Sequence, residues 1–283
     1  MKSEWVEAVL KMSARKADFY SGCRKIITGK TILFNDLWDA EDPLVLEDAG
    51  YTRSKMSHLI RLYVHEESIE AALKLWTLRR SKTSYGSVGF TCYNHFLKND
   101  AVKKSKRASV MGPCIQSVVI TQVKGGGKGQ YFIDAFYRTT ELLKKFPADL
   151  VFIRDILLKD FDFSDMEFMG LRCHFANITV HPQYFVTVLP HLDDPIAELE
   201  KLKKKDRYFY DWVIKWTARY LCEEHYRGIA KFAQALRVKM DADKRITGKR
   251  RRQLVQYLRD NHPGHTRDYK EKDDEEAEAD SED

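Results

Sequence analysis

The stretch QYFIDAFYRTTELLKKFPADLVF, residues 130–152, decides the fold because its hydrophobic pattern changes within a few positions. Its first part, QYFIDAFYR, is rich in β-forming residues and is typical of a strand. From Thr139 onward the spacing of apolar residues predicts a helix that is interrupted or restarted at Pro147. A strand that leads directly into a helix predicts a sheet with a helix covering one of its faces.

Runs of similar character flank this stretch. Strands are predicted for SVGFTCYN (87–94), for IQSVVITQVK (115–124) and, as a pair, for LRCHFANITVHPQYFVTVL (171–189). KGGGKGQ (124–130) is typical of a flexible hairpin loop. RKIITGKTILF (24–34) predicts a strand or hairpin around Gly29, and its GKT is not a phosphate loop because a strand follows it. Helices are predicted at residues 1–20, 54–64 and 68–79.

The order of these segments predicts an α+β fold with a long central helix and a helical C-terminal extension. We divide the chain into an α+β domain at 1–205, a helical basic extension at 206–262 and a disordered acidic tail at 263–283. Residues 268–283 carry ten acids and two lysines, so the rest of the chain is more basic than the net charge of +6. A basic body favours a polyanionic partner.

Cysteine usage and hydropathy bear on the compartment. The five cysteines are irregularly spaced without a Cys-x-x-Cys pair, and the N-terminus does not read as a secretory signal. We therefore expect a reducing, cytoplasmic compartment. No apolar stretch approaches the length of a bilayer span, so we expect no membrane association. Cys222 and His225 have helical spacing but lack two further ligands, so we expect no metal site.

The predicted strands also bring a cysteine and an arginine to the same end of the sheet. Cys114 follows Gly-Pro and directly precedes a strand, and Arg138 ends the next strand. A guanidinium suits a phosphate, and it lowers the pKa of a nearby thiol, which makes that thiol a better nucleophile. Thr139 adds a hydroxyl donor for the same anion. Each residue also has a simpler explanation: a buried cysteine, a surface arginine and a threonine that caps a helix.

The succession of GPCIQSVVITQV and FYRTTELLKKFPAD resembles the active-site segments of the thymidylate synthase and dCMP hydroxymethylase superfamily. Those segments read Pro-Cys-His and then Tyr-Gln-Arg-Ser-x-Asp-x-x-x-Gly-x-Pro-x-Asn. VGFTCYN is similar to that family's strand ending in Ser-x-Trp-Asn, and HFANITVH is similar to its strand with His-x-Tyr. The resemblance spans residues 84–190 and implies a thymidylate synthase-like sheet.

The resemblance implies roles for the matching residues. Cys114 falls on the family's nucleophile, Arg138 on its phosphate-binding arginine and Thr139 on its serine. Glu141 falls on the aspartate near the pyrimidine, and His174 falls on the histidine that binds the sugar hydroxyl.

The family's second arginine pair, which reaches the phosphate across a dimer, is missing from the matching positions. Gly86 and Ser87 stand there instead. Arg79 and Arg80 lie nearby in the sequence, so they are the candidates for a second phosphate contact.

Asp149 stands where thymidylate synthases have an asparagine that reads uracil. Cytosine presents an N3 acceptor and an amino donor, which a protonated carboxyl group matches. The dCMP-using members of the family carry aspartate at this position, so Asp149 favours a cytosine nucleotide. An equally weighted alternative is that Asp149 caps the helix that follows Pro147.

The implied activity is transfer of a one-carbon unit to C5 of a pyrimidine nucleoside monophosphate. Cys114 would add to C6, and 5,10-methylenetetrahydrofolate would supply the carbon as a methyl or hydroxymethyl group. A homodimer is implied as well. The alternative function is a non-catalytic thymidylate synthase-like protein that binds nucleotide, nucleic acid or protein. The basic cluster at 244–252 would then contact nucleic acid, or it is the solvated face of a helix.

Overall fold

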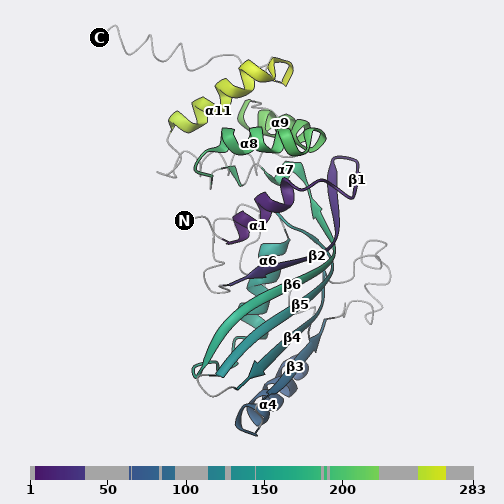
Figure 1. The fold of residues 1–283 in the computed structure, drawn as a ribbon, viewed down its shortest axis with the longest axis vertical. Coiled ribbons are helices and arrows are strands. Elements are labelled where there is room, and N and C mark those ends of the chain that lie inside the picture. The colour runs from purple at the N-terminus through teal and green to yellow at the C-terminus, as the bar shows by residue number, and fades with distance from the viewer. Residues whose placement is uncertain are drawn as a thin grey trace, which may run out of the picture. The chain divides into compact units, whose positions relative to one another are not determined.

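The computed structural model describes residues 4–35, 64, 66–82, 85–92, 114–124, 129–143, 145–185, 188–189, 192–222 and 248–265. The chain forms two compact units, Met1–His181 and Pro182–Asp283 (Figure 1). The sequence placed a boundary after residue 205, whereas the helix at 195–205 belongs to the second unit. The expected helix at 54–64 and the acidic tail from residue 266 onward lie outside the described residues.

The described strands of the first unit form one six-stranded sheet in the order β1-β2-β6-β5-β4-β3. The strands are β1 (Phe19–Ser21), β2 (Arg24–Phe34), β3 (Tyr85–Thr91), β4 (Ile115–Val123), β5 (Gly129–Glu141) and β6 (Met166–Val180). The helices are α1 (Glu4–Ser13), α4 (Glu66–Lys82), α6 (Phe146–Phe152) and η2, a π-helix that continues α6 over Ile153–Leu157. Neighbouring strands are antiparallel except β5 and β6, which are parallel. A mixed sheet with helices is compatible with the predicted α+β class.

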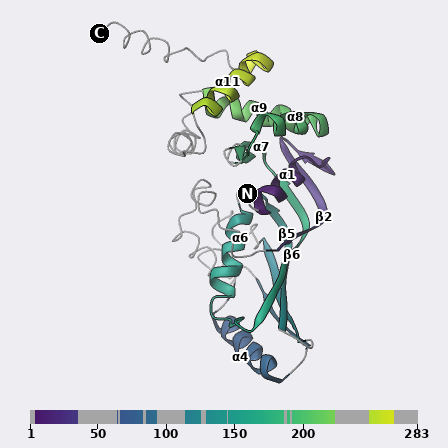
Figure 2. The same cartoon turned by 60° about the vertical axis from the view of Figure 1, so that its left-hand side comes forward.

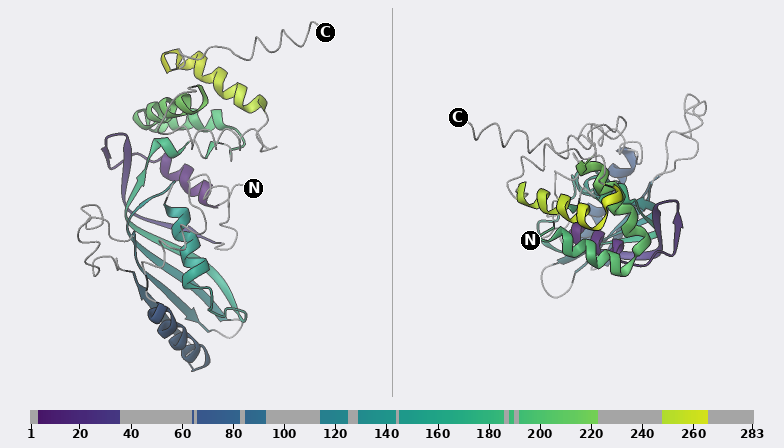
Figure 3. Two further views of the ribbon diagram at one scale, coloured as in Figure 1. Left: turned by 180° about the vertical axis from the view of Figure 1, so that it is seen from behind. Right: turned by 90° about the horizontal axis from the view of Figure 1, so that it is seen from above.

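One face of the sheet is covered by α6, which connects the parallel strands β5 and β6. In Figure 2 the sheet is seen nearly edge-on and α6 stands on one side of it, and the left panel of Figure 3 shows α6 in front of the strands. The ring of Phe146 lies 5.5 Å from Phe34, 5.7 Å from Tyr137 and 5.4 Å from Phe175, which belong to β2, β5 and β6. These contacts bury the apolar side of α6 on the middle of the sheet.

A second aromatic cluster packs α4 against strands β3 and β5. Trp76 of α4 is almost fully buried, and its ring lies 5.9 Å from Phe161 and 5.4 Å from Phe163. Phe163 also stacks on Tyr131 of β5 at 4.1 Å, and Phe161 meets Phe90 of β3 at 5.9 Å. The segment that follows η2 therefore joins a helix to two strands.

The alternation of buried side chains shifts by one residue at the same level of three neighbouring strands. In β5 the buried positions run through Tyr137 and resume at Thr140. In β6 they run through Phe175 and resume at Ile178. In β2 the shift surrounds Gly29, whose φ of 56° lies in the left-handed region that glycine tolerates best. The register of the strands is the same on both sides of this level, so the alternation shifts without a change in which residues pair.

Several elements differ from the sequence predictions. The helix predicted from Thr139 begins only at Phe146, because β5 continues to Glu141 alongside β6. The central helix is therefore shorter than predicted. The strand pair expected at 171–189 is one long strand, β6, followed by the short helix α7 (Pro182–Phe185). Gly29 lies inside β2, and the hairpin turn is at Gly22, between β1 and β2.

The second unit is helical in its described part. It contains α7, α8 (Pro195–Lys205), α9 (Arg207–Cys222), α11 (Gly248–Asn261) and the short 3-10 helix η4 (Pro263–His265). Asp194 and Asp206 begin α8 and α9, because their carboxylates accept hydrogen bonds from Ala197 N and Phe209 N, both at 3.0 Å. This confirms the predicted helices after Asp206 and the basic helix near residue 250.

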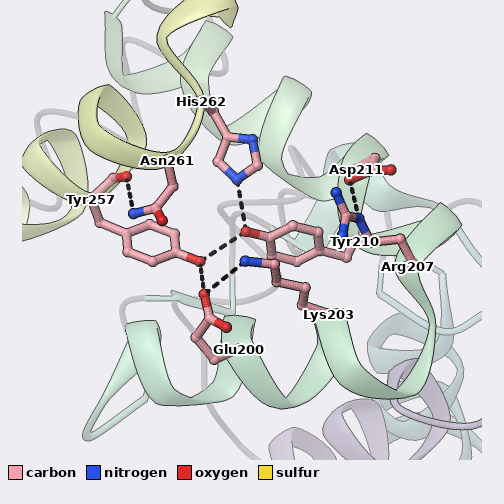
Figure 4. A network of polar contacts seen from close by, with 8 residues as sticks. All are labelled: Glu200, Lys203, Arg207, Tyr210, Asp211, Tyr257, Asn261 and His262. Atoms are coloured by element: carbon pink, nitrogen blue, oxygen red, sulfur yellow. Dashed lines mark hydrogen bonds and ion pairs between the residues drawn. The ribbon is translucent and has the colours of Figure 1, made fainter.

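A network of side chains ties α8, α9 and α11 together (Figure 4). The hydroxyl of Tyr210 on α9 lies 2.8 Å from the hydroxyl of Tyr257 on α11 and 2.8 Å from Nε2 of His262. Tyr257 donates to Glu200 of α8, and Lys203 approaches the same carboxylate at 3.5 Å. Each polar group in this network has a partner on another helix or in the next turn of its own.

Candidate functional site

Cys114 and Arg138 are neighbours at one end of β4 and β5. The backbone N–H of Arg138 donates to the carbonyl oxygen of Cys114 at 3.0 Å, directly beside the paired residues Ile115 and Tyr137. Cys114 is half-buried, whereas the side chain of Arg138 is exposed. The structure thus brings together the cysteine and the arginine that the sequence singled out.

Asp149 approaches the same place from α6. It lies in the first turn of the helix, and its side chain is 7% exposed. Its carboxylate accepts a hydrogen bond from Thr140 Oγ1 at 3.4 Å, a long bond. It does not cap the helix, because the N-cap position is Lys145 and no side chain bonds to the backbone there. Asp149 faces the interior rather than solvent.

Burial raises the pKa of the Asp149 carboxyl to about 8, and Lys145 and the Thr140 hydrogen bond lower it by less. The ionised form is unfavourable because water is excluded and hydrogen bonding is sparse. At neutral pH this side chain is therefore a protonated carboxylic acid that carries a donor and an acceptor.

The pKa of the Cys114 thiol is raised to about 11. Burial is the largest cause and the charge of Asp149 adds to it, while Lys145 and Arg138 act in the opposite direction. Arg138 thus has the effect that the sequence analysis expected, but desolvation outweighs it. At neutral pH Cys114 is therefore a thiol rather than a thiolate.

Three further buried groups surround Asp149, and the sequence analysis did not assign them to the site. The charge of Asp149 raises the pKa values of Cys92, Tyr137 and Cys173, in addition to the larger effect of their burial. The hydroxyl of Tyr137 is buried beside the thiol of Cys173 and, within the part of the chain that the structure describes, has no partner with regular hydrogen-bond geometry. Tyr137 and Cys173 lie on the face of the sheet that α6 covers, which strand alternation alone would have indicated.

Two of the predicted substrate residues have contacts elsewhere. Glu141 accepts a hydrogen bond from the backbone N–H of His181 at 3.2 Å, so it holds the end of β6. His174 lies on the opposite face of the sheet, where Nε2 is 2.9 Å from Asp134 and Nδ1 is 3.1 Å from Thr31 Oγ1. No described contact links His174 to Cys114 or Asp149.

The remaining predicted residues are only partly described. Thr139 is half-buried in β5 beside Arg138. Arg79 donates to the backbone oxygen of Ser87, so it anchors β3 to α4. The side chain of Arg80 and most side chains of the 244–252 cluster lie outside the described residues, and Arg252 of α11 is exposed.

Among the residues that the structure describes, no group of three or more His, Cys, Asp or Glu side chains is arranged to hold a metal ion. No helix in the described ranges has the length and apolar character of a membrane span. Comparison with models of known protein families finds no match, and comparison with curated proteins finds no significant match either.

Proposed function

We propose that the first unit binds a pyrimidine nucleoside monophosphate at Cys114, Arg138 and Asp149 and transfers a one-carbon unit to C5 of its base. One observation carries this proposal. A thiol, a guanidinium and a buried carboxyl from three separate segments act on one another electrostatically at one end of the sheet. They suit a nucleophile, an anion contact and a base contact. The resemblance to thymidylate synthase-like enzymes supplies the reaction class.

The protonation state of Asp149 supports a cytosine nucleotide, namely deoxycytidine monophosphate. With a pKa of about 8, the carboxyl is protonated at neutral pH. Its hydroxyl donates to N3 of cytosine, and its carbonyl oxygen accepts from the 4-amino group. Uracil presents the reverse pattern and leaves the carboxyl mismatched.

Arg138 is the phosphate contact in this proposal. Its side chain is exposed. Its backbone N–H is hydrogen-bonded to Cys114, so the guanidinium and the thiol belong to residues that are neighbours at one end of adjacent strands. Thr139 contributes a hydroxyl beside it. Glu141 and His174 are left out of the proposal because His181, Asp134 and Thr31 occupy their polar atoms.

Cys114 is the nucleophile of the proposed reaction. Its thiolate forms a bond to C6, the C5–C6 double bond opens, and the electron pair at C5 attacks an electrophilic carbon. Loss of the C5 proton and departure of the thiolate then restore the ring. The donor implied by the resemblance is 5,10-methylenetetrahydrofolate, which would supply a methyl or hydroxymethyl group. The described residues show no contact set that fits its pteridine, so no step is assigned to it.

A homodimer is part of the proposal, and the open face of the sheet supports it. Leu33, Val123, Phe136 and Tyr85 are large exposed side chains on β2, β4, β5 and β3, and the strand register places all four on the face opposite α6. Apolar surface of this kind on one sheet face is typical of an interface. Sedimentation velocity should show a dimer that Phe136→Glu dissociates, and a wild-type monomer at micromolar concentration would contradict this part.

A second candidate is a non-catalytic nucleotide-binding protein with the same fold class. The raised pKa of Cys114 favours it, because a thiol of pKa about 11 supplies little thiolate at neutral pH. The two candidates share the nucleotide contact and differ only in whether the thiol reacts.

The test combines binding with turnover. Calorimetry should show that dCMP binds more tightly than dUMP, and Asp149→Asn should reverse this preference because an amide matches uracil. Arg138→Ala should weaken both nucleotides. Folate-dependent release of tritium from C5 of dCMP should occur with the wild-type chain and with Cys23→Ser, and should vanish with Cys114→Ser.

Each outcome separates the candidates. Nucleotide binding without tritium release by the wild-type chain supports the non-catalytic candidate. Absence of binding by both nucleotides rejects both candidates. Turnover that survives Cys114→Ser rejects the assigned nucleophile.

A further inference from the structure

Tyr137 carries a buried hydroxyl that the fold does not use. Its side chain is 2% exposed on the covered face of β5, and its ring lies 4.6 Å from Phe175 and 5.7 Å from Phe146. A phenylalanine ring would make both contacts. Within the part of the chain that the structure describes, the hydroxyl has no partner with regular hydrogen-bond geometry. A buried hydroxyl without a partner destabilises a fold, so its presence here points to a ligand.

The hydroxyl of Tyr137 is near both Asp149 and Cys114. The ring of Tyr137 contacts Phe146, which lies one turn before Asp149 on α6. On β5, the residue after Tyr137 bonds through its backbone to the carbonyl oxygen of Cys114. Burial raises the pKa of Tyr137 well above its ordinary value, and nearby charges, among them those of Asp149 and Cys114, add to this effect. The tyrosine therefore stands among the groups that the proposed function assigns to the reacting base.

The helix that covers Tyr137 is weakly held at its start. Among the described residues no side chain caps α6 at Lys145, and the helix continues as the π-helix η2. Caps stabilise the ends of helices, and π-helical turns are frequent at functional sites. The first turn of α6 carries Asp149. Opening of this turn would admit a planar ring to the side of the sheet that carries Tyr137.

The polar groups at this place are uncharged at neutral pH. The Asp149 carboxyl has a pKa of about 8 and the Cys114 thiol a pKa of about 11, and the pKa of the Tyr137 hydroxyl is well above its ordinary value. Arg138, the anion contact, is exposed instead. A neutral polar cluster suits the uncharged edge of a nucleobase better than a phosphate. Because the Tyr137 hydroxyl stays protonated, it is a hydrogen-bonding group and not a base for the C5 proton.

The order of groups around the cytosine ring assigns the contact of Tyr137. N3, the 4-amino group, C5 and C6 follow one another along one side of the base. In the proposed function, on which this inference rests, Asp149 contacts N3 and one amino hydrogen, and Cys114 reaches C6. A group that is near both falls between them, at the second amino hydrogen. We propose that Tyr137 determines specificity for cytosine because its hydroxyl oxygen accepts this second hydrogen.

The test compares two nucleotides by calorimetry with the full chain. One is dCMP, and the other is the 5′-monophosphate of 2-pyrimidinone deoxyriboside, whose base carries a hydrogen in place of the 4-amino group. Tyr137→Phe should weaken dCMP binding about five- to ten-fold, since it removes one hydrogen bond. It should leave the affinity for the pyrimidinone nucleotide unchanged, because that base has no amino hydrogen to donate.

Tyr208→Phe is the matched control, because it removes a hydroxyl from a side chain that is 48% exposed in the second unit. It should bind both nucleotides like the wild type, and urea unfolding should show that Tyr137→Phe is at least as stable as the wild type. Unchanged dCMP affinity in Tyr137→Phe overturns this inference and leaves the proposed function standing. Equal weakening of both nucleotides also overturns it, since the effect would not depend on the amino group. A wild-type chain that binds neither nucleotide rejects the proposed function itself.

Discussion

Two buried tyrosines, Tyr137 in the first unit and Tyr210 in the second, have opposite surroundings. Tyr137 lies beside Asp149, and its hydroxyl has no regular partner among the described residues. Tyr210 bonds to Tyr257 and His262. The carboxyl groups near these tyrosines also differ. Burial raises the pKa of Asp149 to about 8, whereas the hydrogen bond from Tyr257 lowers the pKa of Glu200.

This difference separates a structural network around Tyr210 from a cluster of poorly paired groups around Asp149. In the second unit every group of the network is paired, so the network holds three helices together and needs nothing else. In the first unit a hydroxyl, three thiols and a carboxyl lie close together, and among the described residues the carboxyl accepts one long hydrogen bond, from Thr140. Buried polar groups without partners destabilise a fold, so their persistence at one place is typical of a binding site.

The largest expected effect concerns the pH dependence of stability through Asp149. Its pKa is about 8 in the folded chain and about 3.9 when unfolded. Between these values the folded chain binds more protons, so its stability falls as pH rises from about 4 to about 8. The full loss should be about 6 kcal/mol, of which about 4 kcal/mol falls between pH 5 and pH 8. Urea unfolding from pH 5 to pH 9 should show this decline in the wild type and a much flatter profile in Asp149→Asn.

The two tyrosines give the next largest contrast. Tyr210→Phe should lower the free energy of unfolding by about 1–3 kcal/mol, because it removes the buried hydroxyl that bonds to both Tyr257 and His262. Tyr137→Phe should be neutral or slightly stabilising, because it removes a hydroxyl that has no regular partner. Urea unfolding measures both, and hydrogen exchange should localise the Tyr210 effect to α11. Equal destabilisation by the two substitutions would show that the clusters are alike.

A smaller effect is expected on the reactivity of Cys114. Iodoacetamide should modify this thiol slowly at pH 7.5, since its pKa is about 11. Asp149→Asn should speed the reaction a few-fold at pH 9, where Asp149 is ionised, and have little effect at pH 6. Mass spectrometry of peptides gives the rates, and Cys23, which is half-buried at the β1–β2 turn, is the internal control. An equal acceleration at both pH values would show that the charge of Asp149 does not act on Cys114.

The smallest effect is expected at the exposed pair of Arg207 and Asp211, which lies outside the Tyr210 network although it is near it on α9. Asp211→Asn should change the free energy of unfolding by less than about 0.5 kcal/mol, because exposed ion pairs are screened by water and salt. Urea unfolding at low and high salt is sufficient to check it. A loss as large as that of Tyr210→Phe would mean that the network extends to this pair.

The sequence predicted much of the sheet and part of the site. Alternation located β3, β4 and most of β5, and the order of segments placed Cys114 beside Arg138. The predicted end of β5 was wrong, because Thr139, Thr140 and Glu141 are compatible with the start of a helix as well as with a strand. Their strand conformation comes from pairing with β6, which local propensity does not contain.

The buried cluster around Asp149 could not be predicted as fully. Cys173 faces Ala135 across two parallel strands, and that register depends on a bulge in β6 near Gly170. The pKa of Cys114 was also beyond sequence reasoning, because it depends on how much water α6 excludes. The neighbouring arginine was visible in the sequence, but the desolvation that outweighs it was not.

The pairing of β2 with β6 has a consequence for how the protein is made. Phe34 lies opposite Leu171, so the ribosome adds roughly 140 residues before the partner of β2 exists. At about 5–20 residues per second, β2 waits for roughly 7–30 s without its central neighbour. Arg24 and Lys25 precede the apolar residues of β2 and Lys30 interrupts them, and such charges oppose association with other nascent chains during this interval. Lys25 is later buried, where its ammonium donates to the carbonyl oxygens of Ser13 and Arg15 at 2.5 and 2.7 Å. A charge that protects the strand during synthesis thus ends by fixing the first helix to it.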